Sequence, residues 1–156
     1  MTYLLDTDSF ILLLRGTSIN RADSPRKVAV KASAARILSH CKRRDAAGDV
    51  IALSAISAAE LEYGLRHGGG YADHAAVLMR LLVPFTVHPF DATDCVHHYG
   101  IVRSELEAKG RGIGPLDTLI AAHALALGAV LVPTTPASSS ACRNWSSRTG
   151  REGALF

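Results

Sequence analysis

The sequence predicts an α/β fold, an α/β/α sandwich around a short parallel sheet of four to five strands. Short apolar segments with the character of buried strands alternate along the chain with longer segments of helical periodicity. The chain has 156 residues, enough for one domain whose core needs no disulfide or structural metal. We find no internal repeat and no second domain.

The first part of the chain contains two predicted strands separated by helices. In order, the elements are a strand at residues 3–5 that ends at Asp6, a helix at 10–14 after the N-cap types at 7–9 that stops at Gly16, a loop at 17–24, a helix opened by Pro25 and ending near Gly48, and a strand at 50–53. Both strand segments are apolar runs, which are typical of strands covered on both faces.

The second part continues the alternation. In order, we expect a helix at residues 58–66 opened by Ser57, a helix at 72–82, a strand at 86–90, a helix from its cap Asp91 through Lys109, a helix at 116–127 after Pro115 with Gly128 as its stop, and a strand at 129–132. Pro89 favours an edge position for the third strand. Residues 133–156 are rich in serine and have no periodicity, so we expect a domain at 1–132 and a poorly ordered tail at 133–156.

Composition narrows the classes of protein. The net charge of +3 and the pI near 8.9 permit a nucleic-acid substrate without requiring one. The three cysteines are odd in number and form no CxxC pair, which is typical of a reducing compartment. No signal peptide and no apolar run of membrane-spanning length is found, so we expect a cytoplasmic protein without a membrane segment.

Three acidic residues are predicted to meet at one edge of the sheet. Asp6 ends the first strand, Glu60 lies in the first turn of the helix after the second strand, and Asp117 lies in the first turn of the helix before the fourth. Ligands of parallel α/β sheets bind outside the carboxyl ends of the strands. Converging carboxylates repel one another unless a divalent cation such as Mg²⁺ neutralises them, and Asp8 is close enough to join. Taken singly, each acid could be a helix cap, as in a capping box of Ser57 with Glu60.

Segments around these acids resemble a known family. Residues 3–8 (YLLDTD), 53–64 (LSAISAAELEYG) and 112–124 (GIGPLDTLIAAHA) resemble the successive acidic motifs of VapC toxins, and residues 99–107 resemble their penultimate helix. The resemblance extends over residues 1 to 132. It implies a PIN-domain fold, a type II toxin endoribonuclease that hydrolyses RNA phosphodiester bonds with Mg²⁺ or Mn²⁺, a cognate VapB-like antitoxin and a homodimer.

The resemblance also implies roles for particular residues. Asp6, Glu60 and Asp117 match the catalytic, metal-binding carboxylates of the family. Asp8 stands where the family often has asparagine, so it is a secondary metal ligand. The arginines at the predicted rim could contact RNA phosphates, although a purely solubilising role is as plausible for each. These are Arg15, Arg66, Arg103 and Arg111.

The tail departs from the family pattern. Relatives usually continue after the last strand with a threonine and two asparagines, or asparagine and aspartate, which supply the fourth polar or acidic group, whereas this chain continues with PTTPASSSACR. GC-rich codons for the family segment, read one nucleotide late, give this sequence, so we interpret residues 133–156 as an out-of-frame tail. Asp8 or Asp94 could replace the lost group. The alternative function is a catalytically weakened protein that acts mainly as an antitoxin-binding partner.

Other interpretations of the motifs are weaker. A phosphate-handling domain of the receiver or phosphatase class also gathers acids at strand ends, and Asp6 with Asp8 fits a phosphatase DxD pair. No lysine follows Val132, however, as a receiver would need. His123 lies in an apolar helix and is expected to be a satisfied core residue rather than a metal ligand.

Overall fold

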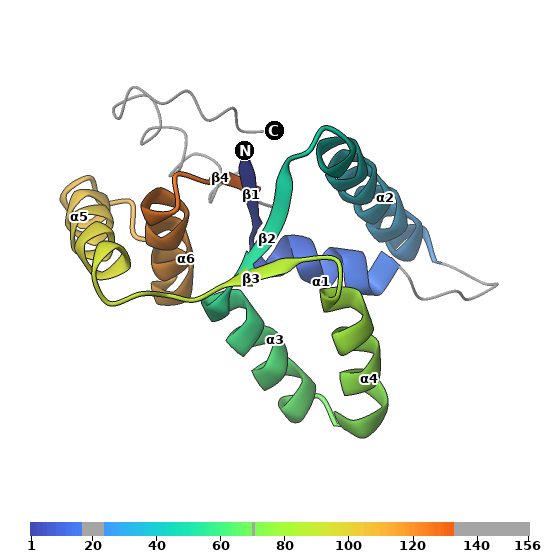
Figure 1. Cartoon of the computed structure of the whole chain (residues 1–156). Coiled ribbons are helices and arrows are strands. Elements are labelled where there is room, and N and C mark those ends of the chain that lie inside the picture. Colours follow the sequence, from blue (N-terminus) through green and yellow to red (C-terminus); the bar gives the residue numbers. More distant parts are fainter. Residues whose placement is uncertain (17–23, 70, 133–156) are drawn as a thin grey trace.

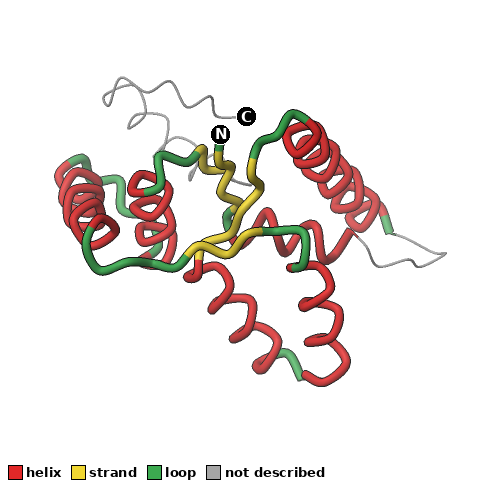
Figure 2. The backbone as a smooth tube through the Cα atoms, viewed as in Figure 1, coloured by secondary structure: helices red, strands yellow, loops and turns green. Residues whose placement is uncertain are grey.

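The protein contains a four-stranded parallel sheet with helices on both sides (Figures 1 and 2). The computed structural model describes residues 1–16, 24–69 and 71–132. Within these ranges the strands are β1 (Thr2–Leu5), β2 (Val50–Ser54), β3 (Thr86–His88) and β4 (Val130–Val132), in the spatial order β3-β2-β1-β4. All three strand pairs are parallel, which confirms the predicted fold class.

Six helices connect or cover these strands within the same ranges. They are α1 (Thr7–Gly16), α2 (Pro25–Ala46), α3 (Ala55–His67), α4 (Tyr71–Leu82), α5 (Asp94–Ala108) and α6 (Pro115–Ala126). Helices α5 and α6 lie on one side of the sheet and α1 and α2 on the other (Figure 1). Helices α3 and α4 form a pair that projects from the end of the sheet where β2 runs into α3.

Alternation along the strands divides the core between the two faces of the sheet. On β1, Tyr3 and Leu5 pack with Phe10 and Leu13 of α1, in a cluster that also receives side chains from α2, α3 and α4. The intervening residue, Leu4, packs on the opposite face with residues of α6. Because strand side chains alternate with a period of two, a buried strand needs apolar residues on both faces, and the run at residues 3–5 meets this need.

The strand order positions the functional edge. The chain moves from β1 to β2 and β3 on one side and then returns to place β4 on the other side of β1. Such a reversal opens a crevice at the carboxyl ends of the two strands that flank it. In this sheet those strands are β1 and β4, and Asp6 is the residue that immediately follows β1.

Several expected element boundaries shift. Helix α3 begins at Ala55 rather than near Ala58, because β2 runs into it without a loop and Ser54, not Ser57, is its N-cap. Helix α5 begins at Asp94, and the carboxylate of Asp91 accepts the backbone N–H of Thr93 and of Asp94 at 2.8 and 2.9 Å before the helix starts. The helix stops are as predicted: Gly48 and Gly128 follow α2 and α6 with positive φ angles of 81° and 57°.

Three further expectations concern the edge strand, a membrane-spanning helix and the tail. Strand β3 is an edge strand, as Pro89 indicated. Among the described helices, none combines the length and apolar character that a bilayer crossing requires. The predicted tail at residues 133–156, and with it the expected frameshift, lies outside the described residues.

Candidate active site

Asp6 lies at the carboxyl ends of β1 and β4, where the strand order reverses. Its backbone N–H donates to the carbonyl of Val132 at 3.3 Å, and its side chain is 8% exposed. Its Oδ1 accepts the backbone N–H of Ser9 at 2.7 Å, so Asp6 caps the N-terminus of α1. The capping role and the rim position predicted for Asp6 therefore occur together in one carboxylate.

Glu60 reaches the same region through Thr7. The Thr7 hydroxyl donates a hydrogen bond to Oε2 of Glu60, which links α1 to α3 across 53 positions of sequence. The predicted capping box is wrong, because Ser54 caps α3 by accepting the backbone N–H of Ile56 at 3.0 Å. Ser57 is buried inside the helix, and Glu60 is in the second turn rather than the first.

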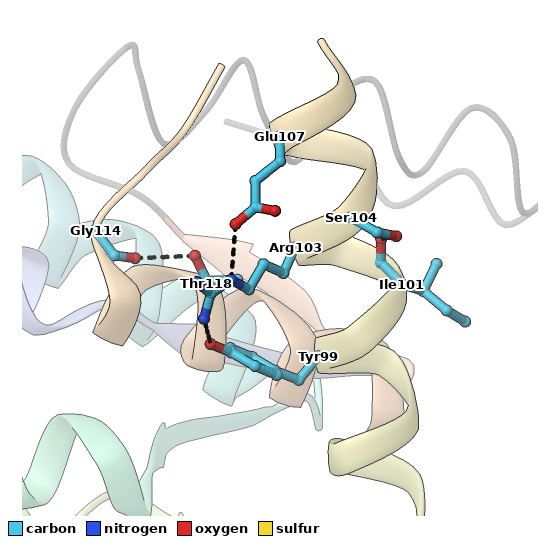
Figure 3. Close-up of polar contacts among 7 residues, drawn as sticks. All are labelled: Tyr99, Ile101, Arg103, Ser104, Glu107, Gly114 and Thr118. Atoms are coloured by element: carbon cyan, nitrogen blue, oxygen red, sulfur yellow. Dashed lines mark hydrogen bonds and ion pairs between the residues drawn. The ribbon is translucent and has the colours of Figure 1, made fainter. Parts of the chain in front are cut away.

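Asp117 folds back over the start of α6. It is the third residue of the helix, and its carboxylate receives a backbone hydrogen bond from Gly114, the N-cap. A Cβ at Gly114 would lie 2.8 Å from Oδ2 of Asp117, so glycine is what allows the carboxylate this position. Beside it, the hydroxyl of the buried Thr118 donates to the Gly114 carbonyl at 2.9 Å (Figure 3).

Electrostatics connect three of the acids. Partial desolvation raises the pKa of Asp117 above its ordinary value, and the negative charges of Asp6 and then Asp8 raise the pKa further. Within the described residues, no three His, Cys, Asp or Glu side chains already stand close enough to hold a metal ion. Glu60 is turned toward Thr7 and Asp117 toward Gly114, so each of these two carboxylates has a partner within the protein.

The two arginines of α3 and α5 predicted to contact RNA are engaged by neighbouring side chains. Arg66 pairs with Glu62 at 2.7 Å, and its guanidinium lies 4.4 Å from the ring centre of Tyr71. Arg103 pairs with Glu107 at 2.8 Å and donates to the Tyr99 hydroxyl at 2.8 Å (Figure 3). Exposed ion pairs of this kind contribute little stability, so phosphate could replace either carboxylate.

The other two arginines and Asp94 occupy different places. Arg15 is exposed in the last turn of α1, and Arg111 is exposed in the loop between α5 and α6. Asp94 opens α5, where its backbone N–H binds Asp91. Of the two acids that could replace the fourth group, Asp8 is the one whose charge, after that of Asp6, raises the pKa of Asp117, and Asp94 is not among the charges that do so.

A buried contact behind the acids was not predicted. The Ser54 hydroxyl lies 2.8 Å from Nδ1 of His123, and both residues are fully buried. Ser54 caps the helix that carries Glu60, and His123 belongs to the helix that carries Asp117. The contact therefore fixes the two acid-bearing helices relative to each other. His123 is buried in the core as expected, but it is only partly satisfied: Nδ1 contacts Ser54, whereas Nε2 has no hydrogen-bond partner among the described residues.

His123 should make stability depend on pH. Burial lowers its pKa, and the nearby His88 lowers it further. A histidine whose folded pKa lies below its unfolded value of about 6.5 binds fewer protons when folded, so the free energy of unfolding should fall as the pH drops below about 6.5. His123→Asn keeps a group that can bind Ser54 and does not titrate, so it should reduce this pH dependence. Urea denaturation on either side of that pH measures the difference.

His40 offers a matched control for this prediction, because burial and then Arg44 and Arg43 also lower its pKa. We expect His40→Asn to retain the part of the pH dependence that His123 causes. An unchanged loss of stability in acid for His123→Asn would show that the buried imidazole does not control it.

Sequence comparisons place this arrangement among known proteins. The sequence model of the PIN domain family matches residues 3–135. Over 87 residues the chain is 40% identical to a protein named Ribonuclease VapC2 from Rickettsia felis, covering 56% of this chain and 64% of that protein. It is 32% identical over 80 residues to a tRNA(fMet)-specific endonuclease VapC from Shigella flexneri, covering 51% and 60%. The matches span less than two thirds of these relatives.

Solved structures resemble a larger share of the chain. The VapBC2 structure from Rickettsia felis, bound to a DNA fragment from its promoter, matches with a TM-score of 0.71 and 29% identity over 86% of this chain and 88% of that one. The VapBC-1 structure from nontypeable Haemophilus influenzae matches with a TM-score of 0.71 and 26% identity, covering 92% and 94%.

Proposed function

Because this chain belongs to the PIN domain family, we propose that it is a toxin endoribonuclease of a type II toxin–antitoxin pair that hydrolyses RNA phosphodiester bonds. One structural observation supports the proposal: at the carboxyl ends of β1 and β4, the negative charges of Asp6 and Asp8 act on Asp117 and, after partial desolvation, raise its pKa. Support also comes from relatives named as a ribonuclease and a tRNA-specific endonuclease.

The donor set suits a hard divalent cation. The charges of Asp6 and Asp8 disfavour the ionised form of Asp117, and Mg²⁺ or Mn²⁺, which prefer oxygen ligands, would offset this repulsion. Asp6, Asp117 and Glu60 would hold the ion, with Asp8 as an additional ligand. When bound, such an ion lowers the pKa of a water molecule and offsets the charge that develops on the phosphodiester.

The chain's own residues prepare this site by orienting its acids. The Ser9 N–H donates to Oδ1 of Asp6 and orients this carboxylate. The Thr7 hydroxyl holds the Glu60 carboxylate, and the Gly114 backbone holds Asp117. Each of the three acids therefore has a hydrogen-bond partner within the protein.

The partners follow from the same proposal. The similar solved structures are VapBC complexes, which supports a VapB-like antitoxin as the partner of this chain. An acidic crevice is suited to an inserted antitoxin arginine, which can bind a carboxylate through two parallel hydrogen bonds. We propose that the protein acts in the cytoplasm as a homodimer.

Cleavage of total cellular RNA tests the function directly. The purified full chain should degrade RNA in the presence of Mg²⁺ or Mn²⁺, and the degradation should stop when EDTA is added. In cells, expression should arrest growth, and Asp6→Asn should relieve the arrest while retaining the cap of α1, since asparagine caps as well as aspartate. Cleavage that survives both EDTA and Asp6→Asn would contradict the proposal.

The sequence after β4 motivates the second candidate function. Residues 133–143 lack the acidic or amide group that the family resemblance leads us to expect, so the chain could act mainly as an antitoxin-binding partner with weakened catalysis. Tight antitoxin binding without growth arrest would favour this function. Sequencing the coding DNA would show whether a shifted frame restores the family pattern.

A further inference from the structure

Beyond Glu60, helix α3 carries an exposed stripe on one face. Glu60, Tyr63, Gly64 and His67 follow the i, i+3, i+4, i+7 spacing that places residues on the same side of a helix. Helix α3 runs away from the sheet and forms, with α4, the arm shown in Figure 1, so the three residues after Glu60 in this series lie progressively farther along α3. The stripe therefore lies where a substrate bound at the acids would continue.

Tyr63 presents a flat aromatic surface within this stripe. Its side chain is 67% exposed, although its ring is stacked on that of His67 with centroids 5.6 Å apart and an interplanar angle of 18°. The stacking covers one face of the tyrosine ring, so the exposed area belongs mainly to the other face and the edges. The tyrosine ring is therefore packed against His67 while most of its surface remains exposed.

Gly64 is the second, independent observation. It lies inside α3, where glycine destabilises a helix relative to alanine. A Cβ at this position would meet no atom within 4 Å, so no packing in the described part of the chain requires glycine here. Glycine permits a ligand to approach the backbone closely, and Gly64 is next to the exposed Tyr63 in sequence.

The charged residues of α3 leave this face uncovered. Glu62 and Arg66 flank the stripe on the side that faces α4, where Arg66 donates to Glu62 at 2.8 Å and the Tyr71 hydroxyl of α4 donates to the same carboxylate at 2.8 Å. This network directs both long side chains toward α4. No salt bridge of α3 therefore crosses the Tyr63 ring among the described residues.

We propose that Tyr63, supported by His67, stacks a nucleobase of single-stranded RNA beside the cleavage site, with the sugar–phosphate backbone passing close to Gly64. The inference rests on the proposed nuclease function and specifies its substrate contact. Base stacking on an aromatic ring tolerates any base sequence. The Tyr63 ring packs on His67 and remains exposed, so it can stack a base. Because Tyr63 lies one helical turn beyond Glu60, the stacked base would belong to a nucleotide near the scissile phosphate.

RNA binding without cleavage tests this subsite. In the full chain carrying Asp117→Asn, with Mg²⁺ present, the affinity for a short fluorescein-labelled single-stranded RNA should fall about tenfold on Tyr63→Ala. Tyr63→Phe should retain the affinity because it keeps the ring. Met79→Ala removes another exposed apolar side chain, 66% exposed on α4, and should change nothing. For an abasic oligoribonucleotide of the same length, Tyr63→Ala should make no difference, since no base is there to stack.

Gly64→Ala separates a binding role from a folding role. The substitution should raise the melting temperature, because alanine favours the helix, and should weaken RNA binding, because the added methyl group blocks the backbone approach. Unchanged RNA affinity in both Tyr63→Ala and Gly64→Ala would overturn the proposal. So would a Tyr63→Ala variant that binds RNA normally but loses its dimeric mass or its antitoxin affinity, since the stripe would then be a protein interface.

The outcome is independent of whether the wild type cleaves RNA. A chain that binds RNA through Tyr63 but never cleaves it would contradict the proposed function and leave the stacking subsite intact. A chain that cleaves RNA with full efficiency after Tyr63→Ala would contradict the subsite alone.

Discussion

Replacing Asp117 by asparagine should abolish RNA cleavage and, in metal-free buffer, stabilise the folded protein. Loss of one metal-binding carboxylate is expected to reduce the cleavage rate by about 100-fold or more. The same change removes the negative charge of Asp117. Partial desolvation, then Asp6 and Asp8, raise the pKa of this carboxyl group, so its ionised form is disfavoured in the fold. Asparagine retains an oxygen that can accept the Gly114 hydrogen bond, so the helix start is preserved.

Two measurements separate the effects. Cleavage of labelled RNA gives the rate, and thermal unfolding with and without Mg²⁺ gives the change in melting temperature. We expect Mg²⁺ to raise the melting temperature of the wild type and to have a weaker effect on the variant. Asp45→Asn, which alters an exposed acid at the end of α2, is the control and should leave cleavage unchanged. A variant that is less stable than the wild type in EDTA would contradict the inferred repulsion.

Phe10→Ala should severely destabilise the fold, because it empties the centre of the core. Phe10 is 1% exposed in the core cluster between α1 and the sheet, and its ring packs edge-to-face on Phe85 with centroids 5.3 Å apart. Truncating a buried phenylalanine costs about 3–5 kcal/mol, which is a large share of the roughly 5–15 kcal/mol that stabilises a typical domain. Urea denaturation should show a strongly reduced midpoint or an unfolded protein.

Phe85 provides the control for this packing. It is only partly buried against the same cluster, so Phe85→Ala should cost less than Phe10→Ala. The stability losses of the two single variants should sum to more than the loss measured for the double variant. The difference, about 0.5–1.5 kcal/mol, is the coupling free energy of the aromatic pair. Should the two single variants prove equally stable, the inferred location of the core between α1 and the sheet would be wrong.

Much of the fold could be predicted because short parallel strands have a strong sequence signal. Residues 3–5, 50–53 and 129–132 are apolar runs bounded by polar or glycine residues, and the observed strands agree with them within one or two residues. The start of α3 could not be predicted in the same way. Ser54 and Ser57 are both suitable caps, and only the three-dimensional course of β2 shows that the strand continues into Ser54 and that the helix follows at once.

The candidate site shows the same division. That Asp6 follows the first strand could be predicted from the sequence, because the end of an apolar run is local information. The partners of the acids depend on contacts across the fold: Thr7 with Glu60 across 53 positions, and Ser54 with His123 across 69. No local pattern encodes such pairs. A threonine beside a candidate catalytic aspartate and a histidine in an apolar helix are the signals that could have suggested them.

The anchoring of Val132 has a practical consequence for fusion proteins. Its carbonyl accepts the Asp6 N–H at 3.3 Å and the Ser9 hydroxyl at 3.0 Å, so β4 ends beside the first acid of the crevice. An affinity tag or reporter joined directly after residue 132 would begin next to Asp6 and would be expected to obstruct the candidate site. The α-amino group of Met1 binds Asp49 at 2.6 Å at the opposite end of the sheet. A tag placed at Met1 removes only one exposed ion pair and lies at the end of the sheet away from the candidate site.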